Sequence, residues 1–243
     1  MSGHSKWSNI KHKKGKNDAL RAKITTKIGK EITVAARLGG ADPTGNMRLK
    51  LALQKARENN VPKENIQRAI QKGIGATDGG NYEEMTYEGY GPGGVAITVE
   101  VMTDNRNRAA ADVRHAFNKH GGNMGETGCV AWMFKRKGVF VVEHDAYDEE
   151  ELMMLALEAG AEDFKSNEDE YEIITTPEDY DAVEQALANA NVPTIVSKIT
   201  MVPDTTIALD GEDARKMQNL LDALDDCDDV KDVYSNVELP DEE

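Results

Sequence analysis

The chain has 243 residues, of which 39% are hydrophobic and 30% charged, as in an ordinary folded protein. Apolar runs such as residues 139–142 are far too short to cross a bilayer, and the first residues lack the apolar core of a secretory signal. Two widely separated cysteines, Cys129 and Cys227, argue for a reducing compartment and against a disulfide framework. We therefore expect a cytoplasmic protein with no membrane segment.

Charge is distributed unevenly along the chain. The formal net charge is −15, which on its own argues against a partner rich in phosphate. However, residues 1–75 hold 17 Lys and Arg against 5 Asp and Glu, a net charge of +12. Residues 138–243 hold 5 against 31, a net charge of −26. Such asymmetry is typical of a protein with a nucleic acid or another charged partner, and the alternative is that both ends are solvated faces that serve solubility.

The basic part predicts a flexible arm followed by three helices. Residues 1–16 are rich in Lys, Gly and Ser and nearly free of apolar side chains. From residue 17 to the glycine pair at 39–40, apolar residues recur at intervals of three and four, the spacing of one helix face. Further helices are predicted at 46–59 and 62–73, where Pro and Gly mark the ends of the second of these. The predicted inward row of the first helix is Leu20, Ile24, Ile28, Ile32 and Ala35.

Beyond a glycine-rich linker at 73–80, the period of the apolar residues changes from that of a helix to that of a strand. Residues 95–101 alternate apolar and other side chains, which predicts a half-buried strand. Residues 82–90 are predicted to join it through a hairpin turn at 91–94. A helix capped at Asp104-Asn105 and a strand at 129–135 are predicted to follow.

From residue 138 on, the predicted order is strand, helix, strand, strand, helix, strand, a ferredoxin-like pattern. These elements are strand 139–143, helix 149–159, strands 162–166 and 170–175, helix 178–190 and strand 194–202. The flanking segments form a second unit of the same kind. They are strand 94–102, helix 106–119 and strand 129–135, with strand 205–209, helix 212–225 and strand 230–237.

The patterns together predict an α+β fold with three domains. Residues 1–75 form a basic helical domain that includes the arm. Residues 81–136 and 203–240 form a discontinuous ferredoxin-like domain, and residues 137–202 form an acidic ferredoxin-like domain inserted into it. We expect a monomer.

The candidate binding residues are the cations of the basic domain. Lys23, Lys30 and Arg37 are spaced by seven, so on an ideal helix they point the same way, away from the apolar row. Such rows suit a polyanion, because each neutralised phosphate releases counterions. Trp7 either stacks on a base or packs back onto the helices. The residues predicted to bind nucleic acid are Lys6, Trp7, Lys11, Lys13, Lys14, Lys16, Arg21, Lys23, Lys27, Lys30, Arg37, Arg48, Lys55, Arg106 and Arg108.

Other chemistry is weakly indicated. The loop at 89–94 lacks the Gly-Lys-Ser/Thr end of a P-loop and favours a tight hairpin. Around Asp104, a helix cap with ion pairs such as Arg108 with Asp112 is favoured over a catalytic base, and a second RNA contact through Arg106 and Arg108 is an intermediate hypothesis. The histidine spacing suits no metal and Cys129 is expected in the core, so we predict no metal and no cofactor.

Four blocks are distributed along the sequence: Gly3-His4-Ser5-Lys6-Trp7-Ser8-Asn9-Ile10-Lys11-His12, the block from Gly40-Ala41-Asp42-Pro43 to Arg48-Leu49, Tyr87-Glu88-Gly89-Tyr90-Gly91-Pro92-Gly93-Gly94, and Thr103-Asp104-Asn105-Arg106-Asn107-Arg108. Together these blocks resemble the signature of the YebC family. The resemblance covers essentially the whole chain. It implies a helical first domain and two α/β domains. It also implies the bacterial label of DNA-binding transcriptional regulator, although mitochondrial relatives are translational activators and bacterial relatives are linked to ribosomes stalled on proline-rich stretches.

We therefore predict a non-enzymatic, nucleic-acid-binding regulator of gene expression, first as a DNA-binding regulator of transcription. The alternative is a ribosome-associated translation factor that binds rRNA or tRNA and relieves stalling. DNA and rRNA present similar phosphate charge, so the residues alone do not separate the two. The acidic half is expected either to stay solvated or to keep itself off phosphates and meet basic ribosomal or transcription proteins. An enzyme is disfavoured, since no nucleophile–base pair or metal motif is evident.

Overall fold

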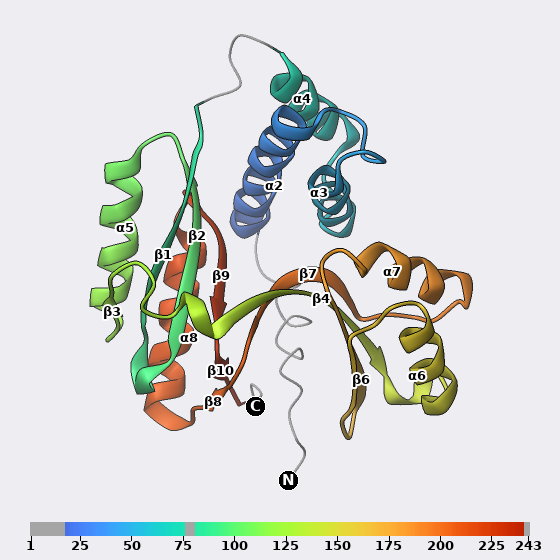
Figure 1. The fold of residues 1–243 in the computed structure, drawn as a ribbon. Coiled ribbons are helices and arrows are strands. Elements are labelled where there is room, and N and C mark those ends of the chain that lie inside the picture. Colours follow the sequence, from blue (N-terminus) through green and yellow to red (C-terminus); the bar gives the residue numbers. More distant parts are fainter. Residues whose placement is uncertain (1–17, 76–80, 241–243) are drawn as a thin grey trace. The chain divides into compact units, whose positions relative to one another are not determined.

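A computed structural model describes residues 18–75 and 81–240 of the chain (Figure 1). It has the predicted α+β class, with a helical region first and two four-stranded sheets after it. The chain forms two compact units. One unit contains Gly128–Arg215 and the chain from Tyr234 on, and the other contains the rest of the described chain up to Thr127 together with Lys216–Val233. The domain boundaries predicted above stay a prediction.

The helical region consists of three helices around a small apolar core. They are α2 (Asp18–Gly39), α3 (Met47–Glu58) and α4 (Lys63–Ile74). Ile32 and Leu49 are fully buried at its centre, and Ile66 and Ile70 of α4 pack against it. The predicted inward row holds from Ile24 on. Leu20 was wrongly included, because it lies one turn before the part of α2 that packs against α3 and α4 and is 37% exposed.

Two close contacts fix the helices to one another. Buried Asn46 caps α3 by accepting the Leu49 N–H at 3.1 Å, and its Nδ2 donates to the carbonyl of Ala35 at 2.8 Å. At Gly73 of α4, an added Cβ would lie 2.4 Å from the Thr33 carbonyl oxygen of α2. Only a residue without a side chain allows α4 to approach α2 this closely. The Thr33 hydroxyl, in turn, donates to the Ala69 carbonyl at 3.1 Å.

The first sheet has the strand order β3-β1-β2-β9. Its strands are β1 (Glu83–Tyr90), β2 (Ala96–Thr103), β3 (Asn123–Met124) and β9 (Val230–Ser235), and its helices are α5 (Arg106–Lys119) and α8 (Gly211–Asp226). The antiparallel register of β1 and β2 confirms the predicted hairpin, whose turn at Pro92–Gly94 requires φ of 73° and 78° at Gly93 and Gly94. Phe117 of α5 and Leu220 of α8 are fully buried.

The second sheet has the order β5-β6-β4-β7, with every neighbouring pair antiparallel, as in a ferredoxin-like fold. Its elements are β4 (Phe134–Glu143), α6 (Glu149–Glu158), β5 (Asp163–Ser166), β6 (Glu170–Thr175), α7 (Tyr180–Asn189) and β7 (Val196–Pro203). Apolar residues of β4 and β6 are buried along most of their length, and Tyr180 of α7 stacks on Phe140 at 4.8 Å between ring centroids. Helices α6 and α7 lie side by side (Figure 1).

The strand predicted at 129–135 is wrong. Residues Ala131–Met133 form a 3-10 turn, closed by the Met133 N–H donating to the Val130 carbonyl at 3.0 Å, and β4 begins only at Phe134. The edge of the first sheet is instead the two-residue β3, paired with β1. The strand predicted at 205–209 is reduced to β8 (Ile207–Ala208), which pairs in parallel with β10 (Val237–Glu238) in a separate small sheet. Cys129, expected in the core, is half-buried.

No helix within the described residues is both long and apolar enough to cross a membrane.

Candidate nucleic-acid interface

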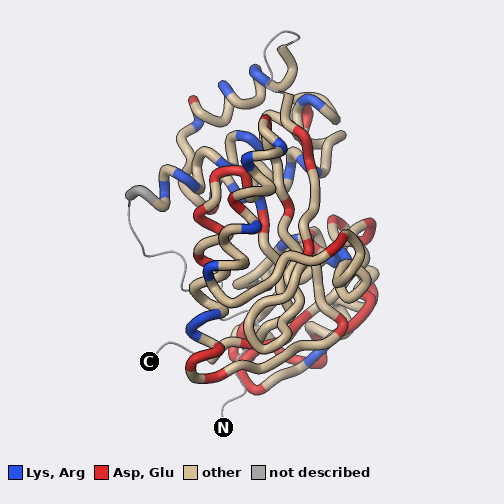
Figure 2. The backbone as a smooth tube through the Cα atoms, turned by 90° about the vertical axis from the view of Figure 1, so that its left-hand side faces the viewer, with Lys and Arg blue, Asp and Glu red and all other residues tan. Residues whose placement is uncertain are grey.

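Lysine and arginine recur along α2, α3 and α4, whereas Asp and Glu predominate beyond residue 138 (Figure 2). The described members of the predicted set lie on α2, on α3 and in the first turn of α5. The arm members lie outside the described residues; they are Lys6, Trp7, Lys11, Lys13, Lys14 and Lys16.

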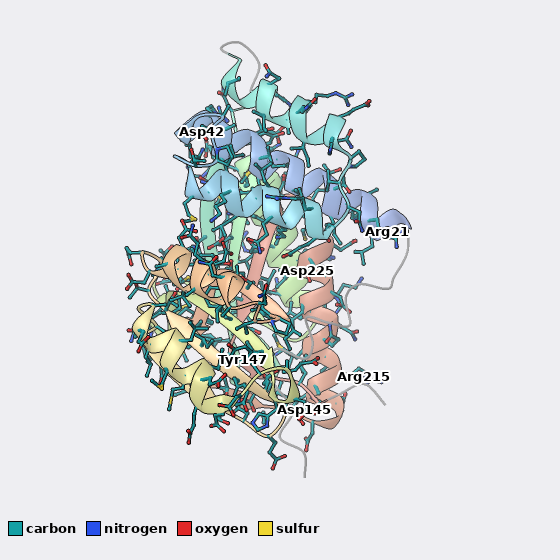
Figure 3. All side chains as sticks on the ribbon, turned by 90° about the vertical axis from the view of Figure 1, so that its right-hand side faces the viewer. Arg21, Asp42, Asp145, Tyr147, Arg215 and Asp225 are labelled. Atoms are coloured by element: carbon teal, nitrogen blue, oxygen red, sulfur yellow. The ribbon has the colours of Figure 1, made fainter. Side chains whose placement is uncertain are left out.

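The lysine row of α2 faces the C-terminal end of α8 and the turn that follows it. Lys23 Nζ lies 2.6 Å from the Asp226 carboxylate, Lys27 Nζ donates to the Asp225 carbonyl, and Lys30 Nζ lies 3.3 Å from the Asp228 carbonyl. Figure 3 shows Asp225 at the end of α8 next to α2, which carries Arg21 in its first turns. The last carbonyls of a helix lack partners within the helix and carry partial negative charge, so they attract cations. We name Asp225, Asp226 and Asp228 the acidic turn.

Two of these lysines differ in electrostatic state. The hydrogen bond to Asp226 raises the pKa of Lys23 above its usual value. Desolvation lowers the pKa of Lys27, because its stem and ammonium group are partly buried between the helices. Lys30 also lies over the ring of Tyr82, 5.7 Å from its centroid. The row predicted to face a polyanion is therefore already in contact with oxygen atoms of this chain.

Arg48 belongs to a network of ion pairs. Its guanidinium binds Glu31 through two hydrogen bonds of 2.7 and 3.0 Å and Glu84 through bonds of 3.2 and 2.5 Å. Lys231 of β9 lies 3.3 Å from the same Glu31 carboxylate. The hydrogen bond to Glu31 raises the pKa of Arg48, and Arg48 lowers the pKa of Glu84. This paired geometry joins α3 to α2 and β1, which is a structural role.

The remaining predicted cations outside α2 also have acidic neighbours. Lys55 lies 3.6 Å from Asp232, and Arg106 lies 3.7 Å from Glu83. Arg108 binds the carboxylate of Asp229 through two hydrogen bonds of 2.9 Å and that of Asp104 at 2.7 Å.

The cluster at the start of α5 is mainly structural. Asn105 caps α5 by accepting the Arg108 N–H at 3.1 Å, as the cap interpretation predicted, but Arg108 pairs with Asp104 and not with Asp112. Asp229 is 3% exposed. Burial raises its pKa, but hydrogen bonds from Arg108 and Thr103 outweigh this effect, so the pKa of Asp229 lies below its usual value. Hence Asp229 stays ionised and holds Arg108 in place.

Exposed cations on α4 and at the end of α3 are absent from the set predicted to bind nucleic acid. Within the described residues, no ion pair involves these side chains, and Arg57 Nε donates to the Leu53 carbonyl at 3.3 Å. On α4, the exposed positions lie opposite the face that carries Ile66 and Ile70, and the exposed amides Gln67 and Gln71 lie among the cations. The signal was present in the sequence, because Arg68 and Lys72 are one turn apart on the polar side of an amphipathic helix. We name the set Arg57, Lys63, Arg68 and Lys72 the α4 surface.

Arg21 and Arg37 are exposed near the two ends of α2. Arg21 carries no acidic partner among the described residues, and Figure 3 shows it at the end of the helix. Lys23, Lys27 and Lys30 are thus held by acidic or carbonyl oxygens, whereas Arg21, Arg68 and Lys72 are exposed and have no acidic partner among the described residues. Among the described residues, no cluster of His, Cys, Asp and Glu is suitable for a metal ion.

Two family models together match nearly the whole chain. The model "TACO1/YebC protein N-terminal domain" matches residues 5–76, and "TACO1/YebC second and third domain" matches residues 82–237. The chain belongs to the TACO1/YebC family. This confirms the resemblance found in the sequence blocks.

Similar proteins extend over the full length of the chain. A protein of Pelotomaculum thermopropionicum is 58% identical over 99% of this chain and 100% of its own length, and one of Natranaerobius thermophilus is 54% identical over 99% and 98%. Both carry the name "Probable transcriptional regulatory protein". The crystal structure of the conserved hypothetical protein Aq1575 from Aquifex aeolicus is 48% identical, with a TM-score of 0.82 over 98% of both chains.

Proposed function

We propose that this protein is a non-enzymatic regulator of gene expression that binds nucleic acid through its helical region. The observation that carries the proposal is the net charge of +12 over residues 1–75, part of which is presented by the exposed α4 surface. Backbone phosphates are the natural ligand of such a surface, since neutralising them releases counterions. The name shared by the relatives supports a role in regulation.

The α4 surface is the first phosphate contact in this proposal. Its α4 cations Arg68 and Lys72 are exposed to solvent. Lys23, Lys27 and Arg48, in contrast, contact acidic or carbonyl oxygens of the same unit. A phosphate bound at Arg68 or Lys72 displaces only water, while one bound at Lys23 has to displace Asp226 as well. The arm lysines add donors near the start of the same helical region.

Transcription through DNA binding is the first candidate role, because the relatives are named probable transcriptional regulatory proteins. Translation is the second candidate, and the charge of the remaining chain favours it. With a net charge of −26, residues 138–243 repel a second stretch of phosphate and suit the basic proteins of a ribosome. A catalytic role for Asp104 has less support, since its carboxylate accepts a hydrogen bond from Arg108. We further propose a cytoplasmic monomer.

Charge reversal on the α4 surface tests nucleic-acid binding. The full chain carrying Arg68→Glu and Lys72→Glu is compared with wild type by fluorescence anisotropy on a short DNA duplex and an RNA hairpin. We expect at least about tenfold weaker binding, and a salt dependence reduced by about two phosphate contacts. The matched control carries Lys165→Glu and Arg215→Glu, two exposed cations of the other unit with the same total change in charge.

The control is expected to change affinity by no more than about threefold, through long-range repulsion alone. An equal loss in both variants would assign the effect to net charge and remove the α4 surface from the proposal. Wild-type protein that binds neither probe at low salt would overturn the proposed function itself. The two roles are separated in cells, since crosslinked ribosomal RNA supports translation and crosslinked promoter DNA supports transcription.

A further inference from the structure

Trp132 is the most exposed large apolar residue in the described part of the chain, with 70% of its surface open to solvent. It lies in the 3-10 turn Ala131–Met133 that immediately precedes β4 (Figure 1). With most of its surface in solvent, this indole contributes little to a core. Tryptophan is enriched at binding interfaces, so an indole this exposed is a candidate contact surface.

The turn restrains this indole. Its Nε1–H donates to the Cys129 carbonyl at 3.1 Å, so the polar edge of the ring is bound to its own turn. The turn is anchored on both sides by buried residues, Val130 at 0% and Phe134 at 5% exposure. With the N–H satisfied and the backbone anchored, the exposed part of the side chain is chiefly its apolar ring surface. Such a platform loses little conformational freedom when a flat ligand stacks on it.

A cation lies close to the same turn. Asp204 links the two features, because its N–H donates to the Met133 carbonyl at 2.8 Å and its carboxylate lies 3.3 Å from Lys135 Nζ. The side chains of Lys135 and Asp204 are 63% and 44% exposed. A pair this exposed is weak, so an incoming phosphate is able to replace Asp204 as the partner of Lys135.

We propose that Trp132 and Lys135 form a binding site for one unpaired nucleotide, with the base stacked on the indole and its phosphate at Lys135. This inference rests on the proposed nucleic-acid function, and it specifies the ligand as an unpaired nucleotide. In a duplex, the faces of the bases are covered by their neighbours, so a stacking platform selects single-stranded or flipped-out nucleotides. A phosphate alone or a regular duplex leaves the indole unused.

Tryptophan fluorescence tests the site directly. The chain contains two tryptophans, Trp7 and Trp132, so a full-length Trp7→Phe protein reports on Trp132 alone. In this background we expect saturable quenching by short oligo(dT) or oligo(U). Adding Trp132→Leu should weaken binding of these strands about tenfold, while binding of a blunt DNA duplex stays within about twofold. Trp132→Phe should restore most of the affinity, because a phenyl ring still stacks.

The possible failures are distinguishable. If the background protein binds duplex and single strands but Trp132→Leu changes neither affinity, the nucleotide site is wrong and the proposed function stands. Equal losses for duplex and single strands would show that the residue acts through the fold, which also overturns the site. Binding of single strands without quenching of Trp132 overturns it too, and leaves protein docking as the use of this surface. If the wild-type chain binds no nucleic acid, the proposed function fails first.

Discussion

Helices α2 and α4 both present rows of cations, but these rows have different surroundings. Lys23, Lys27 and Lys30 of α2 contact oxygens at the acidic turn, whereas Arg68 and Lys72 of α4 face solvent. Charge per helix therefore does not indicate which helix binds a polyanion. What decides is the free energy of removing the partner that each cation already has, which is small for water and larger for a carboxylate.

Among the cations of the helical region, we expect Arg48 to contribute most to the stability of the fold. We expect Arg48→Ala to lower the free energy of unfolding by about 2 kcal/mol, because it leaves Glu31, only 15% exposed, with one fewer cationic partner. Lys55→Ala is the matched control on the same helix, where an exposed pair at 3.6 Å is worth less than about 0.5 kcal/mol. Urea unfolding of both variants measures the difference. Equal losses in the free energy of unfolding would mean that Arg48 stabilises the fold no more than Lys55 does.

Neutralising the acidic turn should make α2 more like α4. Changing all three aspartates of the acidic turn to Asn removes the carboxylate that binds Lys23. Lys27 and Lys30 keep their carbonyl partners but lose nearby negative charge. We expect about fivefold tighter binding to duplex DNA with a steeper salt dependence. The same charge change on α6, Glu149, Glu150 and Glu151 to Gln, controls for net charge. A gain of the same size in both proteins would show that the acidic turn does not compete with nucleic acid.

The smallest expected effect is a pH dependence at the junction of α3 and β1. Arg48 lowers the pKa of Glu84 from its unfolded value near 4.5. A depressed carboxyl pKa contributes stability that is complete above pH 4.5 and is lost as pH falls through the folded pKa. Unfolding measured between pH 6 and pH 3, at roughly half-unit steps, should show a shallower acid loss in Glu84→Gln than in wild type. Parallel curves would remove Glu84 from the network.

The sequence predicted most of the helices and the second sheet, because their signals are local. Asn46 before an apolar row predicts a helix start, and continuous apolar residues at 139–142 predict a buried strand. The prediction failed at 129–135, where a short apolar run with no clear period fits a strand or a turn equally well. In the structure, the Met133 N–H donates to the Val130 carbonyl, and this hydrogen bond closes a turn.

The sequence predicted the cations of the candidate site but not the partners that some of them contact. The excess of Lys and Arg in residues 1–75 is visible at once. The partners of Lys23 and Lys27 are not, since Asp225 and Asp226 lie about 200 residues further along the chain. The exposure of Trp132 likewise depends on how a short turn is anchored. No periodic pattern of residues in this segment predicts the conformation of the turn.

The close approach of α4 to α2 at Gly73 has a consequence for how binding at the two helices is coupled. Because it sets α4 directly against the backbone of α2, a ligand on one helix and the acidic turn on the other act on the same packed pair. If docking of the turn weakens binding at α4, then an occupied α4 must loosen the turn by the same factor, since linked equilibria are reciprocal. The absence of a Cβ at Gly73 thereby couples nucleic-acid binding at α4 to the contact between α2 and the acidic turn.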